Sequence, residues 1–339
     1  MNGADSLVKT MLASDVNVCF ANPGTSEMHF VAALDSHPDM RCILCLFEGG
    51  TSGAADGYYR MSGRVAATML HLAPGFGNAF SNLHNARKAG SGVLNVMGDH
   101  ATYHLQYDSP LKGDTEGVSR AISHWTRSSL SSADVARDGA DAIRAAQARG
   151  GQIATLILPG DTAWNPGGVV ADALATPQRS SVDADRVEEA AKFLTGPDSL
   201  IILGGVALTE QGLELAGKIS AKTGCGLLTE WSNARLERGA GRVAVNRIPY
   251  PVEQALEVLK PYSRIVLVGS KAPVAFFAYP DKPGVLTQDG TEFVELCDWG
   301  GDILGGLDAL CDTVGASASA PVGVAAASRP DIPEGALHP

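Results

Sequence analysis

One carboxylate near the N-terminus is placed where it could do chemistry. Glu48 directly follows the apolar run at residues 42–47 and precedes glycine and alanine residues, which let another molecule approach closely. Removal from water at that position would raise the pKa of the Glu48 carboxyl and let it hold or share a proton near neutrality. A second interpretation stays open, in which Glu48 is an acidic residue at a helix N-terminus that the helix dipole favours.

A histidine and a glycine-containing segment follow the next apolar run. His71 ends residues 65–70 and faces either a ligand cleft, as a titrating group, or the sheet core, as a structural histidine. The segment after it contains Gly75, Gly77 and Asn78, which suit a strand-to-helix turn or an anion site at a helix N-terminus. Its spacing is not G-x-G-x-x-G, so it does not predict a dinucleotide site.

Two further histidines lie in an irregular polar loop. His100 and His104 stand near Asp99 and two tyrosines, where they suit a loop surface or a substrate contact. A metal site needs more ligands in a defined geometry, so no residue is predicted as a metal ligand.

Six cysteines are spread thinly through apolar segments. This spacing indicates reduced core residues of a cytoplasmic protein. Cys42 and Cys45 form a C-x-x-C pattern, but inside a predicted strand, where residues three apart point to opposite faces.

Short apolar runs alternate with helical patterns along the first part of the chain. Buried strands are expected at residues 16–21, 41–47, 65–70, 92–97 and 152–158, with helices between them, including one at 51–60 and one at 79–88. This alternation predicts an α/β fold with a doubly wound parallel sheet. Ligands collect at the carboxyl ends of such strands, where residues 22–27, 47–50 and 71–78 would meet.

A second α/β pattern follows the first. We expect one domain at 1–164, a linker at 165–182, a second doubly wound parallel-sheet domain at 183–314, and an Ala/Ser/Pro-rich linker at 315–339. In the second domain, Gly204 and Gly205 follow a predicted strand but lack a third glycine, so packing explains them better than a nucleotide site.

Composition excludes several partners. The 26 Lys and Arg against 37 Asp and Glu give a net charge of −11, without the basic cluster that nucleic acid or an anionic membrane surface would require. No apolar stretch approaches the roughly 18–20 residues of a membrane span, and the N-terminus lacks a signal-peptide pattern.

Three motifs, in their order and spacing, resemble the pyrimidine-binding domain of thiamine-diphosphate enzymes, with acetolactate synthase-like proteins and benzoylformate decarboxylase as the most similar groups. The motifs are Asn22-Pro23-Gly24-Thr25, then Glu48 followed by Ala54-Ala55-Asp56-Gly57-Tyr58-Tyr59-Arg60, and Pro74-Gly75-Phe76-Gly77-Asn78. The second domain is similar to the central domain of the family.

The resemblance implies a role for each matching residue. Glu48 would hydrogen-bond the N1′ atom of the cofactor's aminopyrimidine and favour the imino tautomer that removes the thiazolium C2 proton. His71 would transfer protons, and Thr25 and His71 would face the substrate. His100, from the polar loop, is the third predicted substrate contact. The other cofactor-binding positions would be Asn22, Pro23, Gly24, Pro74, Gly75 and Asn78.

The chain also departs from the family pattern. Phe47 stands where many synthases have a histidine, whereas His71 matches decarboxylase-like members. The Gly-Asp-Gly…Asn motif that binds the diphosphate and Mg²⁺ in a third domain is absent. The chain is therefore expected to hold at most the pyrimidine half of thiamine diphosphate, either as a fragment or with a partner chain that supplies the missing domain.

The predicted function is the N-terminal and central part of a thiamine-diphosphate enzyme that acts on a 2-oxo acid, by decarboxylation or carboligation. A homo-oligomer (dimer or tetramer) or a second chain is expected, with Mg²⁺ and without FAD. Two alternatives remain, a non-catalytic regulatory or scaffold homologue and a flavin- or nucleotide-binding α/β protein.

Overall fold

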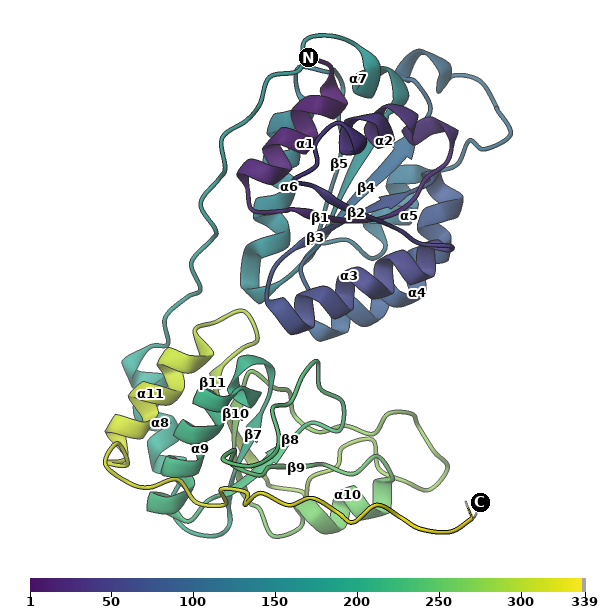
Figure 1. Ribbon diagram of the computed structural model, residues 1–339. Helices are drawn as coiled ribbons and strands as arrows, with labels where there is room; N and C mark the ends of the chain where they lie inside the picture. Colours follow the sequence, from purple (N-terminus) through teal and green to yellow (C-terminus); the bar gives the residue numbers. More distant parts are fainter. Residues whose placement is uncertain (337–339) are drawn as a thin grey trace. The chain divides into compact units, whose positions relative to one another are not determined.

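The computed structural model describes residues 1–336, which form two compact units (Figure 1). The first is Met1–Arg179 and the second begins at Ser180. The change from one unit to the other falls within the range 165–182, where the sequence predicts a linker. Residues 337–339, the end of the expected C-terminal linker, lie outside the described residues.

The first unit contains a six-stranded parallel sheet in the order β2-β1-β3-β4-β6-β5. Its strands are β1 (Val18–Asn22), β2 (Arg41–Leu44), β3 (Ala66–Leu70), β4 (Val93–Asp99), β5 (Trp125–Ser128) and β6 (Ile153–Pro159). The chain moves outward from β1 to β2 and then, from β3 onward, in the opposite direction. The strand order therefore reverses between β1 and β3, and this is where a doubly wound sheet opens a ligand crevice.

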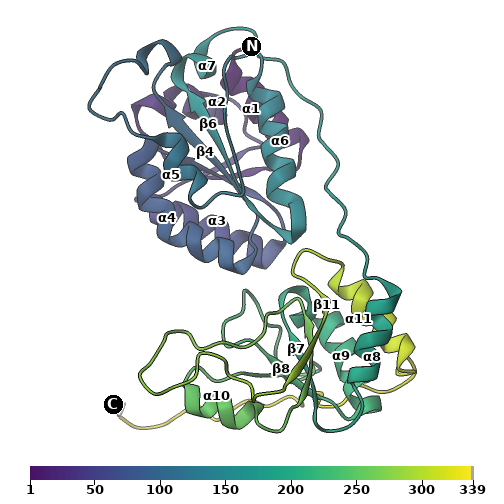
Figure 2. The same cartoon turned by 180° about the vertical axis from the view of Figure 1, so that it is seen from behind.

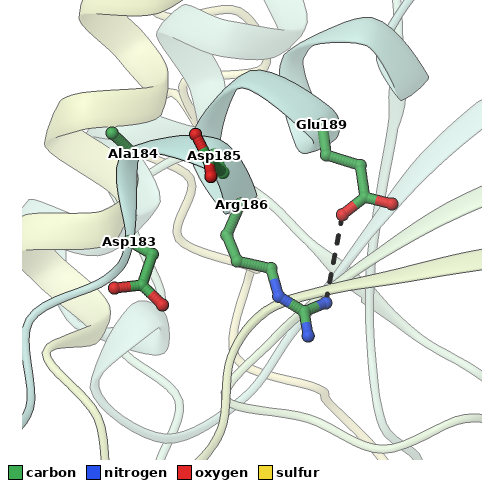
Figure 3. A pocket seen from close by; sticks show the side chains of 5 residues that line it. All are labelled: Asp183, Ala184, Asp185, Arg186 and Glu189. Carbon is green, nitrogen blue, oxygen red and sulfur yellow. Dashed lines mark ion pairs between the residues drawn. The ribbon is translucent and has the colours of Figure 1, made fainter.

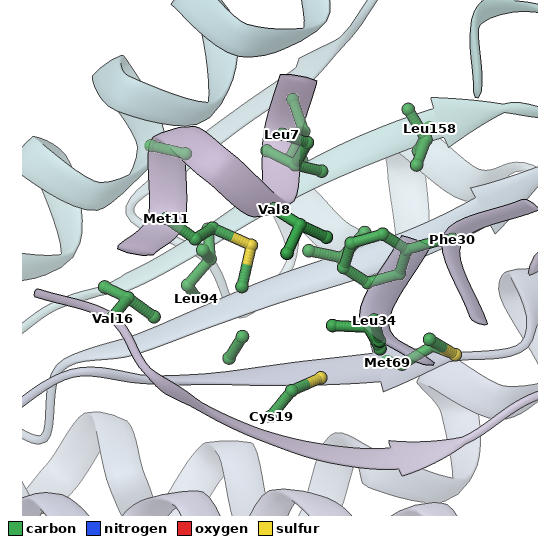
Figure 4. Close-up of a cluster of buried hydrophobic side chains, with 14 of the residues drawn as sticks. Leu7, Val8, Met11, Val16, Cys19, Phe30, Leu34, Met69, Leu94 and Leu158 are labelled. Atoms are coloured by element: carbon green, nitrogen blue, oxygen red, sulfur yellow. The ribbon is translucent and has the colours of Figure 1, made fainter. Parts of the chain in front are cut away.

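Helices cover both faces of this sheet (Figures 1 and 2). They are α1 (Gly3–Ala13), α2 (Met28–Asp35), α3 (Glu48–Ser62), α4 (Leu72–Ala89), α5 (Thr115–Arg120), α6 (Val135–Gln147) and α7 (Gly160–Trp164). One core contains Leu7 and Met11 of α1 and Phe30 of α2 against β1, β3 and β4 (Figure 4). The opposite core contains Phe76 and Leu83 of α4. The predicted α/β class is confirmed.

The expected buried strand at 41–47 is wrong in length and burial. β2 ends at Leu44 and is largely exposed, as is the Leu46 side chain at 97%. β2 lies at the edge of the sheet, where β1 is its one neighbour among the described strands. Its apolar side chains are therefore exposed instead of buried. For the same reason Cys42 is exposed and Cys45 is only half-buried, so the prediction that every cysteine is a core residue is wrong at both.

Two helices begin earlier than predicted. α3 begins at Glu48, and α4 begins at Leu72 instead of residue 79. Pro74 and Gly75 therefore lie within the first turn of a helix, where proline costs nothing because its missing N–H would have no helical partner.

The second unit contains a five-stranded parallel sheet in the order β11-β10-β7-β8-β9. Its strands are β7 (Ser199–Leu203), β8 (Gly226–Thr229), β9 (Asn246–Arg247), β10 (Arg264–Val268) and β11 (Glu292–Cys297), and its helices are α8 (Ala184–Phe193), α9 (Glu210–Thr223), α10 (Val252–Leu259) and α11 (Ile303–Thr313). Beyond α11 the chain is extended and hydrogen-bonds to Gly217 and Arg242 of the same unit. No helix within residues 1–336 is long and apolar enough to cross a membrane.

Candidate functional site

Three connections meet at the carboxyl edge of the first sheet, around the reversal between β1 and β3. β1 leads into the 3₁₀ turn η1 (Thr25–Glu27), β2 leads to Glu48, and β3 leads to His71. Asn22, at the end of β1, donates from Nδ2 to the Cys45 carbonyl at 2.7 Å, which ties the first connection to the second. The topology thus brings Asn22, Glu48 and His71, predicted from separate motifs, to one edge.

Glu48 lies at the N-terminus of α3 with only 8% of its surface exposed. Its Oε2 atom accepts a hydrogen bond from Asn78 Nδ2 of α4 at 2.9 Å. Among residues 1–336, none donates a hydrogen bond to the second oxygen, Oε1. Glu48 is therefore a helix N-terminal acid and also a buried carboxylate, with one oxygen held by Asn78 and one available.

Gly75 lets this carboxylate pack against the first turn of α4. A Cβ atom at position 75 would lie 2.7 Å from Glu48 Oε1 and 3.3 Å from the Cβ atom of His71. Any side chain there would therefore displace Glu48. Because Gly75 lies next to both Glu48 and His71, the Glu48–Asn78 pair and His71 are close together.

Glu27 is a site residue that the sequence analysis missed. Its Oε2 atom lies 2.8 Å from His71 Nδ1 and accepts the Gly24 amide at 2.8 Å. Burial raises the pKa of the Glu27 carboxyl, while the hydrogen bonds from His71 and Gly24 oppose that rise. The available signal was an acidic residue three positions after a turn glycine, a capping-box spacing, but its partner lies 44 residues away.

The Glu27–His71 pair fixes the imidazole. With Glu27 ionised, Nδ1 carries the proton that faces Glu27, and Nε2 remains free to accept or release a proton. Gly24 packs directly on the ring, because a Cβ atom at position 24 would lie 2.1 Å from His71 Nδ1. The His71 side chain is 22% exposed, so solvent reaches part of the ring. His71 therefore lies at the partly exposed carboxyl edge of the sheet and not in the sheet core.

The entry to α4 is strained. Leu72 has a φ angle of 51°, in the left-handed region that a branched side chain adopts at a cost of about 1–2 kcal/mol. Complete burial of Leu72 holds it there. Strain of this kind persists where surrounding structure over-determines it and is concentrated at functional sites. Here it turns the chain so that His71 and Pro74 flank the same edge.

A cavity of about 290 Å³ lies at the carboxyl ends of β1, β4 and β6. Thr25, Ser26 and His100 line it, together with Leu111 and Trp164. The structure therefore brings Thr25 and His100 together, as two predicted substrate-facing residues, while Glu48 and His71 do not line this cavity. Pro23 lies between Asn22 and Gly24 in the first connection.

Hollows in the second unit have a different chemistry. The one in Figure 3 is lined by Asp183, Ala184, Asp185, Arg186 and Glu189, with an Arg186–Glu189 ion pair at 4.0 Å. Three carboxylates against one guanidinium do not suit an anionic cofactor. Within residues 1–336, no group of three or more His, Cys, Asp or Glu side chains could hold a metal ion.

Comparisons with known proteins match both units. Residues 1–124 match the family model described as thiamine pyrophosphate enzyme, N-terminal TPP binding domain. The chain is 48% identical to the putative acetolactate synthase large subunit IlvX of Mycobacterium tuberculosis, over 99% of this chain and 64% of the relative. It is 28% identical to benzoylformate decarboxylase of Pseudomonas aeruginosa, over 88% of this chain and 59% of that enzyme.

Solved structures share the fold. A putative thiamin diphosphate-dependent enzyme from Mycobacterium smegmatis superposes with a TM-score of 0.80 at 20% identity, covering 97% of this chain and 66% of that one. A 4-hydroxybenzoylformate decarboxylase from Rhodococcus jostii gives a TM-score of 0.78 at 18% identity, covering 99% and 66%. The chain spans about three fifths of the length of the two curated relatives described above.

Proposed function

Because this chain belongs to the thiamine-diphosphate enzyme family, as its motifs predicted, we propose that it forms the cofactor-activating half of an enzyme that acts on a 2-oxo acid. The observation that carries the proposal is the buried Glu48 carboxylate, held by Asn78 through one oxygen and open at the other. It lies at the edge where doubly wound sheets bind ligands.

The residues present fit the pyrimidine half of thiamine diphosphate. A carboxyl with one available oxygen suits a ring nitrogen that shares a proton. Gly24 and Gly75 have no Cβ atom to clash with His71 and Glu48, so both side chains keep their positions at the sheet edge. When bound, thiamine diphosphate supplies a nucleophilic thiazolium carbon and accepts the electrons that leave a 2-oxo acid with its carboxylate.

The chain's own residues have separate tasks in this proposal. Glu48 holds a proton at Oε1, and Asn78 keeps the carboxyl oriented by occupying Oε2. His71 exchanges a proton through Nε2, while Glu27 fixes Nδ1. The hydroxyls of Thr25 and Ser26 line the adjacent cavity, where they can bind the carboxylate or oxo oxygen of the substrate.

The diphosphate and Mg²⁺ are assigned to protein outside this chain's described residues, in a partner chain or a further domain. The longer length of the relatives supports this assignment. So do the exposed apolar side chains of Met28, Leu46 and Phe47 near the Glu48 connection, since exposed apolar patches mark contact surfaces. A dimer, a tetramer or a complex with a second chain would cover them.

Decarboxylation is the reaction that the site favours, because His71 is fixed in one tautomer and can deliver a proton to the product. Acetolactate synthase-like carboligation is the second candidate. The 48% identity to a protein named as a putative acetolactate synthase large subunit supports it.

The test uses the chain assembled with the part of the 48% identical relative that this chain does not match. We expect calorimetry to detect binding of thiamine diphosphate with Mg²⁺, and product analysis to detect turnover of aliphatic or aromatic 2-oxo acids. Glu48→Gln should abolish turnover, and Glu116→Gln, at an exposed carboxylate, should not. If a demonstrably folded assembly binds no cofactor, the non-catalytic scaffold alternative replaces this proposal.

A further inference from the structure

Three of the six cysteines gather on the first two strands of the first unit. Cys19 of β1 and Cys42 of β2 are register partners in a parallel pair, and Cys45 follows the end of β2. The other cysteines lie in the second unit and are all buried. Cys42 is the one cysteine among residues 1–336 that is classed as exposed.

The backbone places the Cys19 and Cys42 side chains within bonding range. Neighbouring strands lie about 4.8 Å apart, and register partners point to the same face of the sheet. A disulfide needs Cα atoms about 4.4–6.8 Å apart, and the spacing of neighbouring strands meets that requirement. Cys45 is three positions along the chain from Cys42 and faces the other way.

The two thiols differ in environment. Cys19 is completely buried in the core on the α1 and α2 side of the sheet (Figure 4), whereas Cys42 meets solvent because β2 is the edge strand. A hydrogen bond with Cys19 lowers the pKa of Cys42 to about 7, and the same contact together with burial raises the pKa of Cys19. Cys42 is therefore the more acidic of the two cysteines and the one on the exposed strand.

We propose that Cys42 and Cys19 form an oxidisable dithiol site that reacts with hydroperoxides, with Cys42 as the attacking thiolate and Cys19 as the resolving thiol. The site is independent of the proposed cofactor chemistry. It rests on the β1–β2 register and on the exposure of an edge strand.

The reaction balances in two steps. The Cys42 thiolate attacks one oxygen of hydrogen peroxide, the O–O bond breaks, and Cys42 sulfenic acid and hydroxide form. The Cys19 sulfur then attacks the Cys42 sulfur, an S–S bond forms, the S–O bond breaks, and the oxygen leaves as water with the Cys19 proton. Two thiols lose two electrons, and the peroxide accepts both.

The bond would link the strands that lead into the functional site. It closes the segment between residues 19 and 42, which contains Gly24 and Glu27. It also joins β1 to the strand whose continuation, at the Cys45 carbonyl, accepts the Asn22 side-chain hydrogen bond. Oxidation would therefore restrain the connections around the site.

The experiment treats the full chain with hydrogen peroxide and maps disulfides by mass spectrometry after tryptic digestion. Trypsin separates residues 10–41, which contain Cys19, from residues 42–60, which contain Cys42 and Cys45. We expect these two peptides to become linked. A bond within the 42–60 peptide alone, or no bond while Cys42 remains a free thiol, overturns the proposal.

Variants assign the sulfurs. Cys42→Ser should abolish the link and Cys45→Ser should preserve it. Cys19→Ala should leave a sulfenic acid on Cys42 that dimedone traps. We expect Cys42 to react at least about tenfold faster than the buried Cys225, because the thiolate is the reactive form. Equal rates at Cys42 and Cys225, or a link that survives Cys42→Ser, would contradict the assignment. Wild-type mapping still decides the question if Cys19→Ala fails to fold.

Discussion

The two units share a parallel doubly wound architecture, yet their carboxyl edges differ in chemistry. In the first unit, the reversal between β1 and β3 gathers two polar pairs, Glu48–Asn78 and Glu27–His71, in each of which the glutamate is buried. In the second, the corresponding reversal between β7 and β10 is filled by protein backbone, because a Cβ atom on Gly204 would lie 2.1 Å from the Gly269 carbonyl oxygen. A shared topology provides the position of a site, and the residues at that position decide whether chemistry occurs there.

The second edge has an aromatic surface instead. Trp231, Tyr250 and Phe276 follow β8, β9 and β10. Their rings contact one another edge-to-face or tilted, with centroid separations of 5.1–5.5 Å, and remain exposed. Glu230, beside them, has its pKa raised by burial and accepts the Lys271 amide at 2.9 Å. Glu230 provides a comparison for Glu48, since each comes shortly after a strand, with Glu48 buried and Glu230 half-buried.

The largest expected effect separates these two carboxylates. In the assembled enzyme, Glu48→Gln should lower kcat by at least about 100-fold, the scale of a lost general acid–base group. Glu230→Gln keeps an acceptor for Lys271 and should change kcat by less than about threefold, as expected for a residue that takes no part in catalysis. Steady-state kinetics on both variants measures the difference. Similar losses in the two would mean that the units do not differ as described.

The next effect concerns the Glu27–His71 pair. His71→Ala should lower kcat by about 10- to 100-fold, because proton transfer contributes at this scale. Glu27→Gln should shift the pH dependence of kcat/KM, because the imidazole loses its charged partner at Nδ1. His84→Ala, at an exposed position on α4, serves as the control and should leave both unchanged. An unaltered pH profile in Glu27→Gln would show that the pair does not set the His71 proton.

A stability effect should be confined to the second unit. Gly204→Ala places a methyl group against the Gly269 backbone and should destabilise that unit by about 1–3 kcal/mol, the usual cost of overpacking. Hydrogen exchange should rise at β7 and β10 and stay unchanged at β1 and β3. Gly284→Ala, which meets nothing within 4 Å, should have no such effect. Faster exchange throughout both units would refute their independence.

The smallest effect is a pH dependence of stability. Burial raises the folded-state pKa of Glu27 above its unfolded value, so the folded state holds that proton more tightly. The stability of wild type relative to Glu27→Gln should therefore be highest below the ordinary glutamate pKa and fall as pH rises through the raised pKa. Denaturant titrations between about pH 4 and pH 8 measure it, with the exposed Glu188→Gln as control. A difference that increases with pH would contradict the burial argument.

The sequence predicted the parallel sheets because their apolar runs are short and regularly spaced. It did not predict that β2 is an edge strand, because an apolar run looks the same in a core and at an uncovered surface. The start of α4 was missed because Pro74 and Gly75 signal a turn by themselves, and only the buried Leu72 with its positive φ permits a helix there.

The candidate site was predicted in part for a related reason. Glu48, His71 and Asn78 follow strand ends or belong to recognisable motifs, so their types and spacing mark them. Glu27 and Cys19 do not stand out, because their importance depends on partners, His71 and Cys42, that only the folded chain brings close.

We propose that the Glu48 carboxylate activates the cofactor. The exchange rate of the thiazolium C2 proton reports this activation directly. Proton NMR after dilution into deuterated water can measure this rate for thiamine diphosphate bound to the assembled protein with Mg²⁺. We expect exchange in wild type to exceed that of the free cofactor by at least about 100-fold, and Glu48→Gln to lose most of this acceleration while still binding cofactor. Equal exchange rates in wild type and Glu48→Gln would show that Glu48 does not activate the cofactor.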